Sequence, residues 1–161
     1  MATELQIYDF ENAFEEAVRS LLEANELTVQ TRQNQLKVQS VRPRVQVAFQ
    51  LGADQQHWRM APVTGHKRNA RWVGVLMLTV VNNLTDTGQA LREFVAQVRA
   101  ICSDLWVNLH GSDLLPYHAV NSVVGAGTST ASVNQEEGIE FITLAYNVDF
   151  NIRTSAWPDG Q

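Results

Sequence analysis

The sequence predicts one α+β domain, a mostly antiparallel β-sheet with two helices packed on one face. Two segments repeat their apolar residues at helical spacing, and two others alternate apolar with polar residues as a half-buried strand does. The chain has 161 residues, of which 45% are hydrophobic, and this is enough to bury one core. We expect a single domain over residues 1-161, with elements in the order α-β-β-α-β-β and a long basic loop at about 52-70.

Both helices are amphipathic. In the first, Phe10, Phe14 and Leu21 belong to one apolar stripe, and Asp9 is a suitable N-cap, so we place this helix at about 10-24. The second helix is placed at 90-105, with charged and amide side chains opposite its stripe. That stripe consists of Leu91, Phe94, Val95, Val98, Ile101, Cys102 and Leu105.

Alternation of apolar and polar residues predicts the first and last strands. From Pro43 to residue 51 every second residue is apolar, and the same holds over residues 142-152. Ile139 and Phe141 have the opposite parity to the rest of the last strand. A bulge or twist near residues 141 and 142 is therefore expected.

Three further segments lie between these elements. Residues 71-81 are apolar on both faces, which predicts a central strand covered on both sides. Residues 119-133 are rich in Val, Ser, Thr and small residues, and they predict a strand with a bulge or tip at Gly125-Ala126-Gly127. Residues 31-40 contain few apolar side chains and predict a loop or a weak edge hairpin.

The charges are segregated along the chain. Residues 1-26 have a net charge of -6, residues 27-71 of +7 and residues 72-161 of -6, within a total of -5. Unlike patches on one subunit can meet across a repeated contact, so the pattern suits head-to-tail self-association, although it also suits charges that merely solvate different faces.

The chain lacks a run of about 20 apolar residues, and its first residues are acidic where a signal peptide is basic, so we expect a soluble protein made and kept in the cytoplasm. Cys102 is the only cysteine, which excludes an intramolecular disulfide.

Few residues suggest catalysis or metal binding. His110, Asp113 and His118 are metal ligands by residue type, but no regular element sets their spacing. The segment 125-130 is rich in Gly, Ser and Thr, yet it lacks the lysine of a phosphate-binding loop. Cys102 belongs to the apolar stripe of the second helix, where burial raises a thiol pKa, so we interpret it as a core residue. The expectation is a protein that is not an enzyme and has no cofactor.

The loop at 52-70 and the residues after it combine basic and aromatic side chains. This combination suits either nucleic-acid contact or a protein partner, and we favour a partner because Trp and Arg anchor many protein interfaces. The segment 55-71 is predicted to be an assembly element that becomes ordered against a neighbouring subunit. The candidate partner-binding residues are Trp58, Arg59, Lys67, Arg68 and Arg71.

The order of these segments resembles the tail terminator, or tail completion, proteins of tailed bacteriophages. The resemblance rests on the helix at 10-24, on the apolar strand at 72-81 followed directly by the helix at 90-105, and on the last strand, IEFITLAYNVDF, at 139-150. These features span most of the chain and match the family in element order and pattern. Related neck and tail-tube subunits have comparable sheets, so they remain alternatives, as does a small nucleic-acid-binding module that uses residues 57-72.

The resemblance implies a structural role in the virion. Tail terminators form a ring, here expected to be a hexamer, that caps the tail tube and joins it to the head-proximal connector. The implied partners are copies of the chain, tail tube proteins and neck or connector proteins, with phage DNA passing through the lumen without specific binding and with no membrane contact. Assembly would take place in the host cytoplasm.

Overall fold

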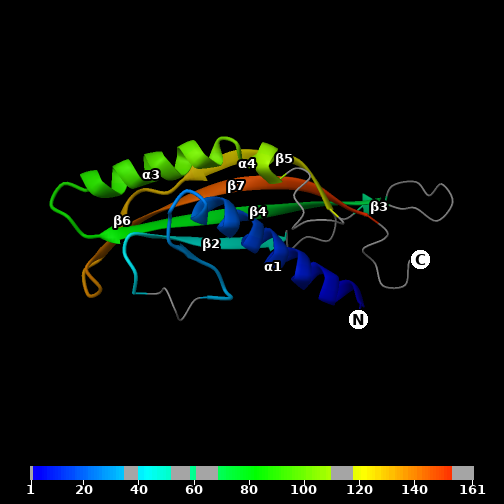
Figure 1. Cartoon of the computed structure of the whole chain (residues 1–161), viewed down its shortest axis with the longest axis horizontal. Coiled ribbons are helices and arrows are strands. Elements are labelled where there is room, and N and C mark those ends of the chain that lie inside the picture. Colours follow the sequence, from blue (N-terminus) through cyan, green and yellow to red (C-terminus); the bar gives the residue numbers. More distant parts are fainter. Residues whose placement is uncertain (1, 35–39, 52–58, 61–68, 110–117, 154–161) are drawn as a thin grey trace.

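The computed structural model describes residues 2-34, 40-51, 59-60, 69-109 and 118-153. Over these residues the chain forms three helices and one seven-stranded sheet, so the α+β fold is confirmed (Figure 1). The sheet order is β1-β2-β4-β7-β5, with β3 paired to β4 and β6 paired to β7. All pairs are antiparallel except β1 with β2. The strands are β1 (Val29–Gln30), β2 (Arg44–Leu51), β3 (Arg59–Met60), β4 (Asn69–Asn83), β5 (His118–Thr128), β6 (Ser132–Asn134) and β7 (Ile139–Arg153).

The first helix, α1 (Ala2–Glu23), begins earlier than predicted. Asp9 lies inside it and is not its N-cap, because the preceding residues include Ala, Leu, Glu and Gln, which favour helix. The predicted second helix is two helices, α3 (Gln89–Cys102) and the short α4 (Leu105–Leu109). The Ser103 hydroxyl donates to the Ala100 carbonyl at the break, 2.7 Å away, and such a bond competes with helix continuation.

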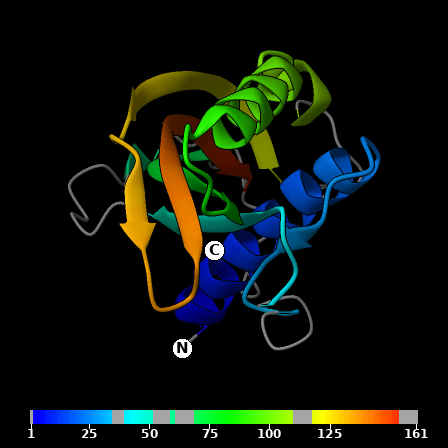
Figure 2. The same cartoon turned by 90° about the vertical axis from the view of Figure 1, so that its left-hand side faces the viewer.

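The core lies between the helices and one face of the sheet. Viewed along the strands in Figure 2, α1 and α3 lie on the same side of the curved sheet. The alternation in β2 and β7 is confirmed, because directly paired residues of β2, β4 and β7 share this buried face. The sheet residues of this core are Val29, Val45, Val47, Phe49, Leu76, Leu78, Val80, Val120, Leu144, Val148 and Phe150, and the helices contribute residues that include Phe14, Val18 and Leu22 of α1 and Leu91, Val95 and Val98 of α3.

Of the bulge or twist predicted near residues 141 and 142 of the last strand, the bulge is wrong. The pairing of β7 with β4 is unbroken from Ile139 to Arg153, so the change of parity does not interrupt the ladder. Ile139 and Phe141 instead lie on the second face of the sheet beside Val81, and Ile139 and Val81 are buried there. The predicted irregularity of the neighbouring segment is confirmed, since β5 shifts register against β7 between Gly125 and Gly127. After it the segment forms a separate strand, β6.

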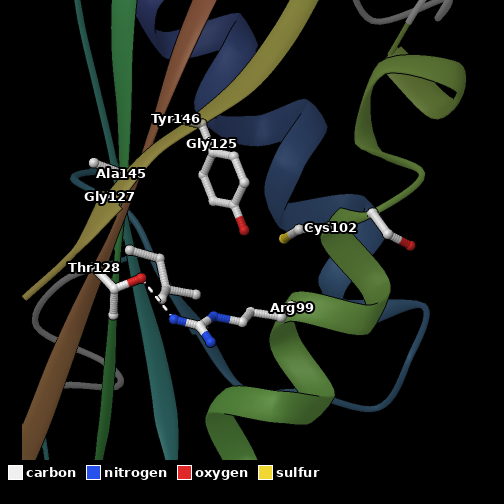
Figure 3. A pocket seen from close by; sticks show the side chains of 9 residues that line it. Arg99, Cys102, Gly125, Gly127, Thr128, Ala145 and Tyr146 are labelled. Atoms are coloured by element: carbon white, nitrogen blue, oxygen red, sulfur yellow. Dashed lines mark hydrogen bonds between the residues drawn. The ribbon is translucent and has the colours of Figure 1, made fainter.

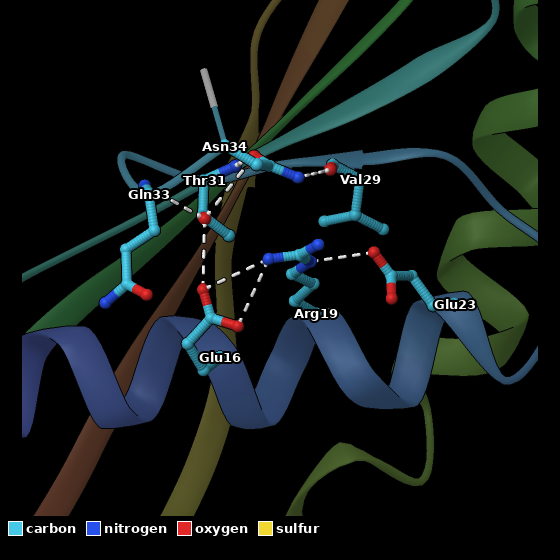
Figure 4. A network of polar contacts seen from close by, with 7 residues as sticks. All are labelled: Glu16, Arg19, Glu23, Val29, Thr31, Gln33 and Asn34. Carbon is cyan, nitrogen blue, oxygen red and sulfur yellow. Dashed lines mark hydrogen bonds and ion pairs between the residues drawn. The ribbon is translucent and has the colours of Figure 1, made fainter. Parts of the chain in front are cut away.

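Polar contacts join α1 to the turn after β1 (Figure 4). Asn34 closes this turn, since its side-chain oxygen accepts from the Thr31 backbone N–H (2.6 Å) and its amide donates to the Val29 carbonyl (2.7 Å). The Thr31 hydroxyl donates to Glu16 of α1 at 3.1 Å. The loop predicted at 31-40 is thus a hydrogen-bonded turn over residues 31-34, while residues 35-39 lie outside the described residues.

A buried carboxylate completes the edge of β2 beyond the point where β1 ends. Glu15, 1% exposed, accepts from the Phe49 backbone N–H at 3.3 Å and from the guanidinium of Arg32. Arg32 also donates to the Phe49 carbonyl at 3.2 Å. Glu15 and Arg32 therefore satisfy the backbone groups of Phe49 that a longer β1 would otherwise pair.

Candidate partner-binding surface

Two of the predicted partner-binding residues, Arg59 and Arg71, lie in paired strands at one end of the sheet. Arg59 of β3 pairs directly with Arg71 of β4, so part of the predicted loop at 52-70 is strand, which is a correction to the sequence interpretation. Because β2 ends opposite Gly74, β4 extends past it and provides the free edge to which β3 pairs (Figure 1). Trp58, Lys67 and Arg68 lie outside the described residues, as do His110 and Asp113 among the possible metal ligands. His118 begins β5.

The second face of the sheet has no helix packed on it within the described residues, so the prediction of a central strand covered on both sides is wrong for its second side. β4 is central in the sheet, but Met77 at its middle is 44% exposed. Met77 lies between Ala48 of β2 and Ala145 of β7 in the register. In the next row Val75 is flanked by Asn147 and, on β5, Val124, which is 59% exposed. Met77 and Val124 are therefore exposed apolar side chains on a sheet face that no helix of the described residues covers, and such a face is a candidate interaction surface.

One outer edge of the sheet is also unpaired over most of its length. β5 and β6 both pair with β7 on their inner side, and no strand of the described residues pairs with their outer side. Near Val120 the edge is covered, because the Trp106 indole donates to its carbonyl at 3.0 Å. An unpaired edge is a template for another strand, so this edge and the open face together offer two contiguous binding surfaces.

At the other end of the open face, arginine side chains line a groove of about 570 Å³. Val81, Ile139 and Phe141 provide its apolar part, and Arg42 and Arg44 its charged part. Arg44 is only 4% exposed, and its Nε donates to Gln30 at 2.9 Å while its Nη1 donates to the Val41 carbonyl at 3.1 Å. Burial and, secondly, the charge of Arg42 lower the pKa of Arg44. The groove therefore holds two like charges close together.

Sequence reasoning missed this groove. Arg42 and Arg44 enter the sequence interpretation only through the net charge of residues 27-71. The available signal was the pair of arginines flanking Pro43 at the start of a strand, combined with the odd parity of Ile139 and Phe141. Neither signal reveals that the two segments meet, because their contact depends on the register of β2, β4 and β7.

A smaller pocket of about 300 Å³ lies between α3 and the strands β5 and β7 (Figure 3). Gly125 and Gly127 leave it open, since a Cβ built on either would contact nothing within 4 Å. Arg99 closes one side by donating to the Thr128 hydroxyl at 2.6 Å. Across it, the Tyr146 hydroxyl points toward the Cys102 thiol. Burial raises the pKa of Cys102 to about 11 and that of Tyr146 to about 12, so both groups are neutral at pH 7.

Cys102 should react slowly with alkylating reagents in the folded protein. A thiol pKa of about 11 in place of the ordinary 9.0 lowers the thiolate fraction at pH 8 about 100-fold. Because the pKa is raised on folding, the stabilisation from the buried neutral thiol is complete below pH 9 and is lost as the pH rises to about 11. Mass spectrometry after iodoacetamide treatment, with and without denaturant, measures the difference. Equal rates in both conditions would show that Cys102 is accessible and contradict its position in the core.

Comparison with protein-family models and with curated proteins finds no match to this chain. Among the described residues, no helix is both long and apolar enough to cross a membrane. In the same part of the chain, no three His, Cys, Asp or Glu side chains are grouped as a metal site requires.

Proposed function

We propose that this chain is a structural subunit of a bacteriophage tail or neck, and that it acts by assembling with other subunits rather than by catalysis. The observation that carries the proposal is the open face of the sheet, with Met77 and Val124 exposed beside the unpaired edge of β5 and β6. A face of this kind fits a protein that is complete only against a neighbour.

The order of elements supports the particular class. The first helix, the long central strand β4 followed by α3, and the last strand β7 occur in the order on which the resemblance to tail terminators rests. In such a protein the subunits form a closed hexameric ring, one side of which contacts the tail tube and the other the neck or connector. Closure of a ring requires two different patches on each subunit, and the open face and the opposite charges of the chain's segments supply unlike surfaces.

A charge placed on the open face should block ring formation. Replacing Met77 with Glu puts a carboxylate into a contact that is apolar on the subunit's side, and we expect the apparent dissociation constant of assembly to rise about tenfold or more. The stability of the free subunit should change little, because the Met77 side chain is 44% exposed. Light scattering and negative-stain electron microscopy report the ring, and thermal melting reports stability.

Val107 provides the matched control. It is 65% exposed and lies on α4, away from the open face, so Val107→Glu changes the same charge without touching the proposed contact. Rings that form equally well with Met77→Glu and Val107→Glu would remove the open face from assembly. A chain that remains monomeric, both purified and within isolated tails, would contradict the proposed function itself.

A further inference from the structure

The groove at the end of the open face contains an arginine donor that the chain itself leaves unused. The Nε of Arg42 is buried without a hydrogen-bond partner among the described residues. Arg44 beside it donates from Nε to Gln30 and from Nη1 to the Val41 carbonyl. A buried donor without an acceptor is costly, so the unpaired Nε of Arg42 indicates that this part of the groove can take an acceptor supplied from outside.

The charge inside the groove is also uncompensated. Among the described residues Glu137 is the one carboxylate that lines it, and its Oε2 is 4.0 Å from Arg42 Nη2, with a side chain that is 57% exposed. An exposed pair at this distance contributes little. The groove thus retains a net positive charge on donors that are largely removed from water, and an entering anion would form charge-assisted hydrogen bonds with them.

The apolar part of the groove narrows the chemistry of the ligand. Val81, Ile139 and Phe141 line the same space, so the ligand should combine an anionic head with carbon atoms that can contact these side chains. The carboxylate of an Asp or Glu side chain, approached with its own CH₂ groups and neighbouring residues, meets both conditions. Inorganic phosphate meets only the first.

We propose that this groove binds an acidic side chain of a second copy of the chain, with Arg42 and Arg44 as the donors. The charge pattern supports this occupant, because residues 27-71, which contain both arginines, have a net charge of +7 while the segments on either side have -6 each. The inference rests on the proposed function and locates one of the two unlike patches that a closed ring requires.

The test compares self-association of three variants of the full chain by sedimentation velocity. Arg42→Gln removes the charge and Arg42→Glu reverses it, and we expect the dissociation constant to rise about tenfold for the first and further for the second. Arg92→Glu is the control, since Arg92 is an exposed residue of α3 and the substitution changes the net charge as Arg42→Glu does. Its dissociation constant should stay within about twofold of the wild type.

Four results would overturn the inference. Equal weakening by Arg42→Glu and Arg92→Glu would mean that only net charge matters. Rings that form normally with Arg42→Glu would exclude the groove from the contact but leave the proposed function intact, whereas a wild-type chain that never self-associates would contradict both. The last experiment is a titration of the wild type with inorganic phosphate at constant ionic strength, followed by NMR. Saturable shifts of resonances around Arg44, together with no effect of Arg42→Glu on association, would identify a site for a free anion instead.

Discussion

Replacing Glu15 with alanine is expected to lower the free energy of unfolding by about 2 to 3 kcal/mol. The substitution removes the acceptor of the Phe49 backbone N–H and the partner of Arg32 in one step. The loss should lie toward the lower end of the range known for buried ion pairs, because the Arg32 side chain is 37% exposed and can be hydrated again. Urea denaturation of the purified subunit measures the effect.

Glu16 is the control for this experiment. It adjoins Glu15 in α1 and has its own partners in Thr31 and Arg19, but its side chain is 31% exposed. Glu16→Ala should therefore cost less than about 1 kcal/mol. If the two alanine variants lost equal stability, the buried carboxylate would have no special part in closing the edge of β2. A double-mutant cycle with Arg32→Ala separates the ion pair from the backbone bond. The coupling energy of the cycle reports the interaction between the two side chains and leaves out the bond from Glu15 to the Phe49 backbone.

Gly74→Ala should destabilise the subunit by about 1 to 3 kcal/mol through overpacking. A Cβ at this position would lie 2.5 Å from Cζ of Phe49 and 3.0 Å from the Gln50 carbonyl oxygen. The Phe49 ring has no free direction in which to move, since it stacks on Phe14 at 4.2 Å between centroids and meets the edge of Phe150 at 6.1 Å. Thermal melting of the variant measures this loss of stability.

Two companion variants test that explanation. Gly125 also lies in a strand, but a Cβ there would meet nothing within 4 Å, so Gly125→Ala should leave the melting temperature nearly unchanged. Phe49→Leu destabilises the core by itself, yet it removes the ring atoms that Gly74→Ala would strike. The double variant Gly74→Ala/Phe49→Leu should therefore be more stable than the sum of the two single losses predicts. Strict additivity would argue against the clash.

The elements that the sequence predicted well have one buried face and a regular period. The apolar stripe from Leu91 to Cys102 and the alternation in β2 and β7 each repeat several times along the sequence. Each of these predictions is confirmed. The limits of α1 were harder, because helix-favouring residues precede Asp9 and nothing local marks where the stripe begins. The parity change at Ile139 misled the prediction, since parity alone does not distinguish a bulge from a second apolar face.

The site was less predictable than the fold, for a physical reason. The basic segment at 52-70 is recognisable from its composition and remains a candidate partner-binding element, but composition does not place its side chains. The groove depends on contacts between residues far apart in the sequence, such as Arg42 with Glu137. It also lies on the second face of the sheet, which the apolar sequence of β4 predicts to be covered. Only the register of the sheet brings these residues together.

The pairing of β4 with β7 also has a consequence for how the chain folds. The centre of the sheet joins strands separated by α3, α4, β5 and β6, so most of its ladder has a high contact order and should form late. During synthesis β4 emerges from the ribosome long before its partner, with an apolar edge open to other nascent chains. Until β7 is synthesised, this edge of β4 is therefore open to mispairing with strands of other chains.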